Sequence, residues 1–207
     1  QEGIVEGSGI KKYSGTINTT HSLLGERLKI TTFAIGSNVL DDNPQISNDA
    51  GAQGDLLSGA WRANPTRPIY NPDGTFAQPD NSERNPGAIL GLTTDKTDTF
   101  RVLAGIAADV KLHETLSYKF NFAIDRSNSE RKSAISKDLN VTTVDVGVAQ
   151  IANVAANNLL LEHTLNFKKE INDNNRISAL LGYSYQRFKL KTRSYRGSHF
   201  LTSDLNI

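Results

Sequence analysis

The most constraining feature of the sequence is a strict alternation of apolar and polar side chains over two neighbouring runs. Every second residue is apolar in residues 100–112 and again in residues 116–124. Charged residues such as Asp109 and Lys111 fall between the apolar positions. Period two is the spacing of side chains on one face of a β-strand. The pattern therefore predicts an antiparallel hairpin with one apolar and one polar face, turning at residues 113–115.

Two further strand pairs are predicted by softer alternation, and each closes with a short turn. The connections between pairs are instead long: about 60 residues from Asn38 to Asp98 and about 30 from Ser127 to Asn158, against a usual length of roughly 4 to 6. Short turns at one end and long loops at the other are typical of outer-membrane barrels. The additional predicted strands are residues 10–22 with 27–37, and 159–167 with 177–185, around turns at 23–26 and 171–175.

Composition excludes several classes of protein. The chain has no cysteine, which excludes disulfides and thiolate metal sites. A net charge of +1 argues against a nucleic-acid surface. No apolar stretch approaches the roughly 18 residues of a membrane helix. A transmembrane barrel alternates apolar and polar residues, so its modest average hydrophobicity remains compatible with this composition.

We therefore predict an all-β fold, an antiparallel transmembrane β-barrel segment of about six strands in three hairpins. The predicted strands, of roughly 10 to 15 residues, meet or exceed the roughly 9 to 11 that a tilted strand needs to cross a bilayer. The apolar face of the 100–124 hairpin carries no charge, whereas its other face carries Asp109, Lys111, Lys119 and Asp125. That arrangement places lipid on the first face and a wet lumen on the second.

The first long connection is expected to be folded. Gly54-Asp55 predicts the start of a short helix that ends near Ala63, before Asn64-Pro65. A proline-spaced segment follows and closes with a turn at residues 71–74. Trp61 and Tyr70 are the best candidate ligand-binding residues, because aromatic faces stack on sugars, although packing within the loop explains them equally well.

No catalytic or metal site is predicted, and no cofactor. The four histidines have no metal-ligand spacing. His163 lies at an apolar position and is interpreted as an amphipathic ring near a membrane interface, and Tyr183 and Tyr185 as girdle residues. Three carboxylates resemble the acid pair of a glycosidase but are more simply explained as lumen-lining groups; they are Asp109, Asp125 and Glu162.

Four strings in order give the chain a resemblance to the SusC/RagA family of TonB-dependent outer-membrane transporters. They are QEGIVEGSGIKKYS with TINTTHSL, GDLLSGAWRANPTRPIYNPDGTF, NPGAILGLTTDKTDTFRVLAGIAADVKL and LLLEHTLNFKKEINDNNRISALLGYSYQ. The resemblance implies a 22-stranded barrel filled by a plug, a SusD-like lipoprotein partner and energy supplied through the TonB complex. It also implies that residues 1–207 belong to the barrel domain, with the plug, TonB box and signal peptide absent.

The leading hypothesis is thus a barrel-wall segment of a nutrient importer in the Gram-negative outer membrane, taking up oligosaccharides or peptides, and not an enzyme. The alternative is a secreted β-rich binding or adhesion module that recognises glycans through its long loops. That alternative predicts that protein covers both faces of each strand pair. A β-rich glycan hydrolase is a third hypothesis and depends only on the scattered carboxylates.

Overall fold

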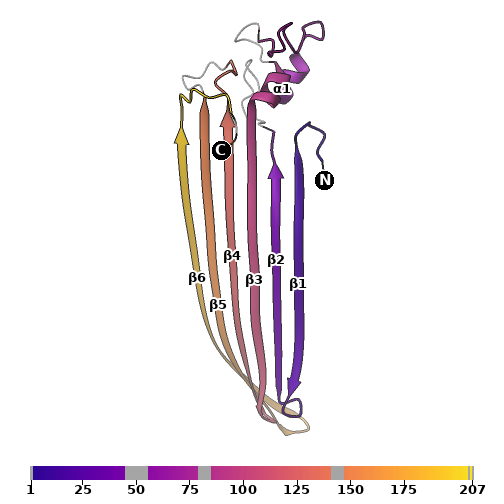
Figure 1. The fold of residues 1–207 in the computed structure, drawn as a ribbon. Coiled ribbons are helices and arrows are strands. Elements are labelled where there is room, and N and C mark those ends of the chain that lie inside the picture. The colour runs from indigo at the N-terminus through magenta and orange to yellow at the C-terminus, as the bar shows by residue number, and fades with distance from the viewer. Residues whose placement is uncertain (1, 45–55, 79–84, 141–146, 205, 207) are drawn as a thin grey trace.

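The structure, a computed structural model, describes residues 2–44, 56–78, 85–140, 147–204 and 206. Its main element is one antiparallel sheet of six strands in chain order, a tall and gently curved wall (Figure 1). Two short helices lie in the connection between the second and third strands, at the end of the sheet opposite the turns. The elements are β1 (Gly9–Leu23), β2 (Leu28–Asp42), α1 (Leu56–Arg62), α2 (Pro86–Leu92), β3 (Thr93–His113), β4 (Leu116–Ile135), β5 (Val148–Asn172) and β6 (Asn175–Gly197).

The three predicted hairpins are confirmed, and their turns gather at one end of the sheet, which we call the turn end (Figure 1). Residues 24–27 join β1 to β2, residues 114–115 join β3 to β4, and residues 173–174 join β5 to β6. The register is regular across the sheet, and its two irregularities both lie beside turns. Each strand residue can therefore be assigned to one of the two faces. The opposite end is the loop end.

The predicted bounds of the long connections are wrong, because the strands extend further than the alternation does. β4 and β5 both continue into the segment predicted as a connection from Ser127 to Asn158, and only residues 136–147 join them. The first connection shortens to residues 43–92. Beyond Ile124 polar side chains occupy both faces, so the periodic signal disappears while backbone pairing continues.

The helix ending before Asn64-Pro65 and the turn at residues 71–74 are confirmed, whereas the predicted helix start at Gly54-Asp55 lies outside the described residues. α1 ends before the Asn-Pro pair, and the backbone N of Gly74 donates to the carbonyl of Asn71 at 2.9 Å, with Gly74 at a φ of +84°. α2 was not predicted, although its start carries a recognisable signal. Asn85 is its N-cap and accepts a hydrogen bond from the backbone N of Gly87, and a proline follows in the first turn.

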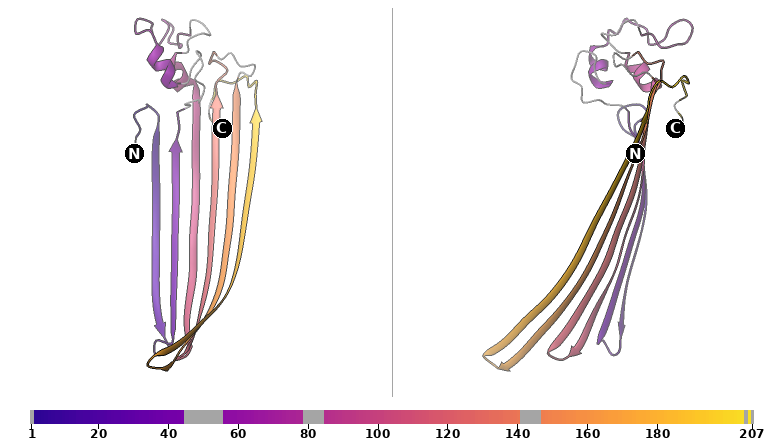
Figure 2. Two further views of the ribbon diagram at one scale, coloured as in Figure 1. Left: turned by 180° about the vertical axis from the view of Figure 1, so that it is seen from behind. Right: turned by 90° about the vertical axis from the view of Figure 1, so that its left-hand side faces the viewer.

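The buried core of the described residues lies at the loop end. Leu56 of α1, Ala88 and Ile89 of α2, and Leu139 after β4 are buried against one another. The strands themselves form a single layer when seen from the side (Figure 2). The alternative hypothesis predicts protein on both faces of each strand pair. Among the described residues, the buried strand positions Asp95 and Ala134, and Ile135 against the core, all lie near the loop end. Neither described helix has the length and apolar character needed to cross a membrane.

Candidate functional site: two sheet faces and a loop cap

The register sorts strand residues onto two faces of different polarity. Ala104 of β3 lies between Ala34 of β2 and Ile124 of β4. Residues two positions apart along a strand share a face, so these three define what we call the apolar face. Gly105 and Ala123 pair on the opposite side, which we call the polar face. The face assignment predicted from alternation within single strands thus holds across neighbouring strands.

A band without Lys, Arg, Asp or Glu crosses the apolar face of all six strands. On β3 it extends from Phe100 to Leu112, which is about 28 Å of height at roughly 3.3 Å per residue and a tilt of about 45°, close to the hydrocarbon thickness of a bilayer. Its upper edge comes nearer the turn end on the later strands, as expected where tilted strands cross a membrane. The band comprises the apolar-face positions within residues 13–23, 28–40, 100–112, 116–124, 159–167 and 177–185.

His163 lies in the middle of this band on β5, and its predicted place near a membrane interface stays a prediction. Its Nδ1 is 2.5 Å from the hydroxyl oxygen of Tyr118, and its ring centroid is 5.3 Å from that of Phe120 and 6.1 Å from that of Tyr183. The tyrosine satisfies a polar atom of the imidazole, which allows the ring to remain among apolar neighbours. Among the described residues no group of three or more potential metal ligands gathers here or elsewhere.

The polar face carries charged side chains of the same strands, and each of the three carboxylates singled out from the sequence has a partner there. Asp109, Asp125 and Glu162 each have a different partner, which gives each carboxylate a structural role. A glycosidase would instead need two of these carboxyl groups to act together on one bond. The contacts are Arg101 Nε to Asp125 at 2.9 Å, Lys119 Nζ to Asp109 at 3.9 Å, and Asn121 Nδ2 to Glu162 at 3.3 Å.

At the loop end, α1, α2, the 69–77 turn and residues 136–140 pack into a unit that we call the loop cap. Two glycines of α2 allow the turn to approach closely. A Cβ on Gly87 would lie 2.7 Å from Cγ2 of Ile69, and one on Gly91 would overlap the ring of Phe76. The side-chain amide of Asn85 also donates to the carbonyl of Ile69, at 2.7 Å. The cap is therefore held by close helix-to-turn packing as well as by its small core.

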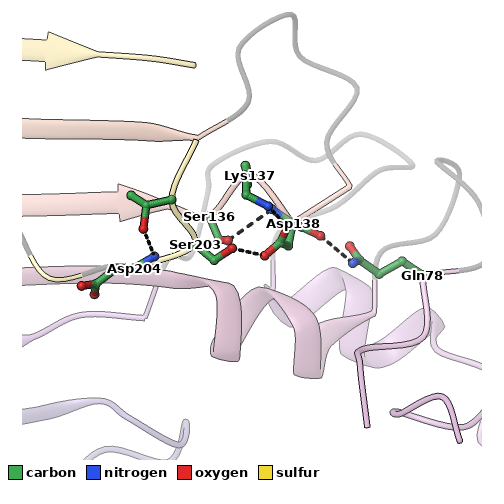
Figure 3. Close-up of polar contacts among 7 residues, drawn as sticks. Gln78, Ser136, Lys137, Asp138, Ser203 and Asp204 are labelled. Atoms are coloured by element: carbon green, nitrogen blue, oxygen red, sulfur yellow. Dashed lines mark hydrogen bonds and ion pairs between the residues drawn. The ribbon is translucent and has the colours of Figure 1, made fainter. Parts of the chain in front are cut away.

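Polar contacts fasten three distant segments at the edge of the cap (Figure 3). The carbonyl of Asp138 accepts a hydrogen bond from Nε2 of Gln78 at 2.8 Å. The carboxylate of Asp138 accepts from Lys137 Nζ at 2.7 Å and from the hydroxyl of Ser203. Hydrogen bonds from Lys137 and then Ser203 lower the pKa of Asp138. The carboxylate therefore stays ionised at neutral and mildly acidic pH and holds residues 198–204 against the cap until the pH falls below its ordinary pKa of 3.8.

Both aromatic residues singled out from the sequence lie in the cap. Trp61 on α1 is 85% exposed, and Tyr70 packs on Phe76 with ring centroids 5.0 Å apart. A pocket of about 460 Å³ lies in the same unit, and its lining includes Arg67 and Asn71 but neither candidate aromatic. The sequence analysis did not single out Arg67 as a pocket residue, and it interpreted Asn71 only as a turn residue. The ligand-binding role of Trp61 and Tyr70 stays a prediction.

Comparison with known proteins identifies relatives of the chain. No family model matches it. It is 30% identical over 193 residues to TonB-dependent receptor P26 of Formosa agariphila, covering 90% of this chain and 18% of the relative. It is 26% identical over 134 residues to TonB-dependent receptor SusC of Bacteroides thetaiotaomicron, covering 54% of this chain and 13% of the relative. The chain thus spans only about a fifth or less of the curated relatives it matches.

Solved structures share the fold. The RagAB peptide importer in its closed-closed state aligns with a TM-score of 0.71 at 16% identity, over 94% of this chain and 22% of the solved chain. Its open-open state aligns with a TM-score of 0.71 at 14% identity, over 97% of this chain and 22% of the solved chain. The solved structures show the fold of a barrel-wall segment. Together with the sequence relatives, which are all TonB-dependent receptors, they identify the chain as a fragment of a SusC/RagA-type TonB-dependent transporter.

Proposed function

We propose that this chain forms part of the wall and outer loops of an importer in the outer membrane of a Gram-negative cell. The observation that carries the proposal is the uncharged band, which crosses the apolar face of all six strands while the polar face carries ion pairs. Lipid covers the apolar face, and a water-filled lumen lies against the polar face. The short turns then face the periplasm and the loop cap faces the outside.

The cargo that we propose is an oligosaccharide or a peptide. The solved neighbours are structures of a peptide importer, which supports a peptide cargo. An oligosaccharide cargo, a SusD-like lipoprotein partner and coupling to TonB are implied by the family resemblance. The chain spans about a fifth or less of its curated relatives, so the transport function proposed here is that of a whole transporter. The role of this segment is to supply wall and entrance.

The face assignment can be tested with two neighbouring positions of β4 in the full-length protein. Phe122 lies in the uncharged band, and Asn121 lies on the polar face at the same height. This segment has no cysteine, so in a cysteine-free full-length background F122C and N121C can each carry one fluorophore. In lipid nanodiscs, we expect lipid-attached quenchers to quench the label at 122 and aqueous iodide to quench the label at 121. Quenching of both labels by the same agent would contradict the proposal.

The loop cap is proposed to cover the cargo at the entrance, with Trp61 as an exposed stacking surface. We expect Trp61→Ala to weaken cargo binding by about fivefold, equivalent to about 1 kcal/mol for one aromatic contact. Leu24→Ala is the matched control, because Leu24 is 76% exposed at the turn end. Titration calorimetry of the full-length transporter with a panel of peptides and oligosaccharides measures both variants. Equal affinities would remove Trp61 from the binding surface.

A further inference from the structure

A row of cations continues the apolar face beyond the uncharged band, toward the loop end. On β6, four alternate residues after Tyr185 are basic: Arg187, Lys189, Lys191 and Arg193. Their register partners on β5 lie on the apolar face, so the four side chains share that face. Arg126 of β4 adds a fifth cation there, opposite Asn157. We call these five residues the cationic row.

The cationic row borders a groove of about 780 Å³. β5 forms its floor with the short side chains of Asn153, Ala155 and Asn157, while longer side chains of β4 and β6 form its sides. None of its lining residues is acidic, and within the described part of the chain the five cations make no salt bridge. On the same face, the acidic residue nearest to the groove in register is Glu130, which pairs with Asn153. Its Oε1 lies 3.5 Å from Nζ of Lys132. The groove is therefore positively charged and suited to an anion.

The height of the row indicates which anion. Arg187 is the first apolar-face residue beyond the band on β6, about 5 Å above its edge at roughly 3.3 Å per residue and a tilt of about 45°. Arg193 lies about 19 Å above the edge by the same reckoning. The headgroup layer of a phospholipid leaflet is only about 5 to 8 Å thick. A phospholipid would reach the lower cations alone, whereas a glycolipid with phosphates along its saccharide would reach all of them.

We propose that this groove binds the phosphate groups of a phosphorylated glycolipid in the outer leaflet, on the outside of the barrel wall. The inference rests on the proposed function for the face assignment. Lys and Arg donate charge-assisted hydrogen bonds to phosphate, and Arg can do so in bidentate fashion. The amides of Asn153 and Asn157 on the groove floor can donate to or accept from sugar hydroxyls. The cationic row thereby fixes the height of the wall against the lipid surface.

The test uses purified full-length protein in detergent, titrated with a lipopolysaccharide that has a phosphorylated core and followed by native mass spectrometry. Removing two charges in K189Q/K191Q is expected to weaken binding about 25-fold, from about fivefold for each surface cation. K189R/K191R keeps the charge and is expected to bind as the unmodified protein does. K168Q/K169Q removes two charges at the turn end and is expected to have no effect. The same lipid after dephosphorylation is expected to bind weakly to every variant.

Three results would overturn the inference. The first is equal lipid binding by K189Q/K191Q and the unmodified protein. The same result is expected if the groove binds an acidic protein instead of the lipid. The second is binding that survives dephosphorylation of the lipid. The third is binding of inorganic phosphate alone with the same dependence on Lys189 and Lys191. The quenching of labels at positions 121 and 122 is measured separately from lipid binding. If only the lipid-binding result fails, the face assignment still holds. If the quenching result fails, the face assignment itself is wrong.

Discussion

Replacing Ala104 with arginine in the full-length protein places a charge in the uncharged band. Ala104 lies between Ala34 and Ile124, and it is two residues from the centre of the 100–112 band, about 5 Å from the membrane midplane. An arginine on the lipid face costs about 2 to 4 kcal/mol at the midplane and less toward the interface. We therefore expect Ala104→Arg to lower the free energy of unfolding in lipid vesicles by about 2 to 3 kcal/mol.

Ala123→Arg is the matched control, because it makes the same chemical change on the neighbouring strand. Ala123 lies on the polar face between Gly105 and Leu160, and Asp125 is the next residue of β4 on that face. Water and a nearby carboxylate can solvate the new charge, so a cost below about 1 kcal/mol is expected. Urea titration of the protein folded into vesicles measures both variants. Equal costs, or a larger cost at position 123, would refute the assignment of the faces.

Two further predictions concern the loop cap. Gly91→Ala is expected to destabilise the cap despite alanine's better helix propensity, because the new Cβ would overlap the ring of Phe76. In the control Gly15→Ala the new Cβ meets no atom within 4 Å, so this variant is expected to be neutral. Amide hydrogen exchange measures both, and it should become faster in the cap of Gly91→Ala alone. The pKa of Asp138 is lowered, so its contribution is present above its ordinary value of 3.8 and is lost as the pH falls through the lower folded value. In the unmodified protein, residues 198–204 should therefore become sensitive to protease only in that acidic range. In Asp138→Asn they should be sensitive already at pH 7. The same pH dependence of proteolysis in both proteins would contradict this.

The strand pairing could be predicted wherever one face is apolar and the other polar. In residues 100–112 and 116–124 the alternation marks both the strands and their faces, and the short turn sets the register. Beyond Ile124 the same strand continues to Ile135 with polar residues on both faces. No local signal marks it there, because the pairing is imposed by the backbone of β3 and β5. The second connection was predicted too long for this reason.

The loop cap was predictable only in part. The sequence marks α1 by the Asn-Pro pair after it, and it marks the start of α2 by Asn85 and the following proline. It does not indicate that Gly91 receives the ring of Phe76, because that contact depends on how two segments are placed in space. The hydrogen-bond partner of His163 likewise depends on the register, because Tyr118 lies 45 positions earlier on another strand.

The sequence by itself determined the class of fold and which strand face carries no charge, because side-chain direction in a strand is a local property with period two. The tertiary structure decided what the aligned strands create together. Arg126 and Lys189 are unremarkable basic residues in the sequence, yet the register of β4, β5 and β6 brings them to opposite sides of one groove. The grouping of five cations around one groove, and hence its proposed ligand, follows from the register of three strands, which no single strand encodes.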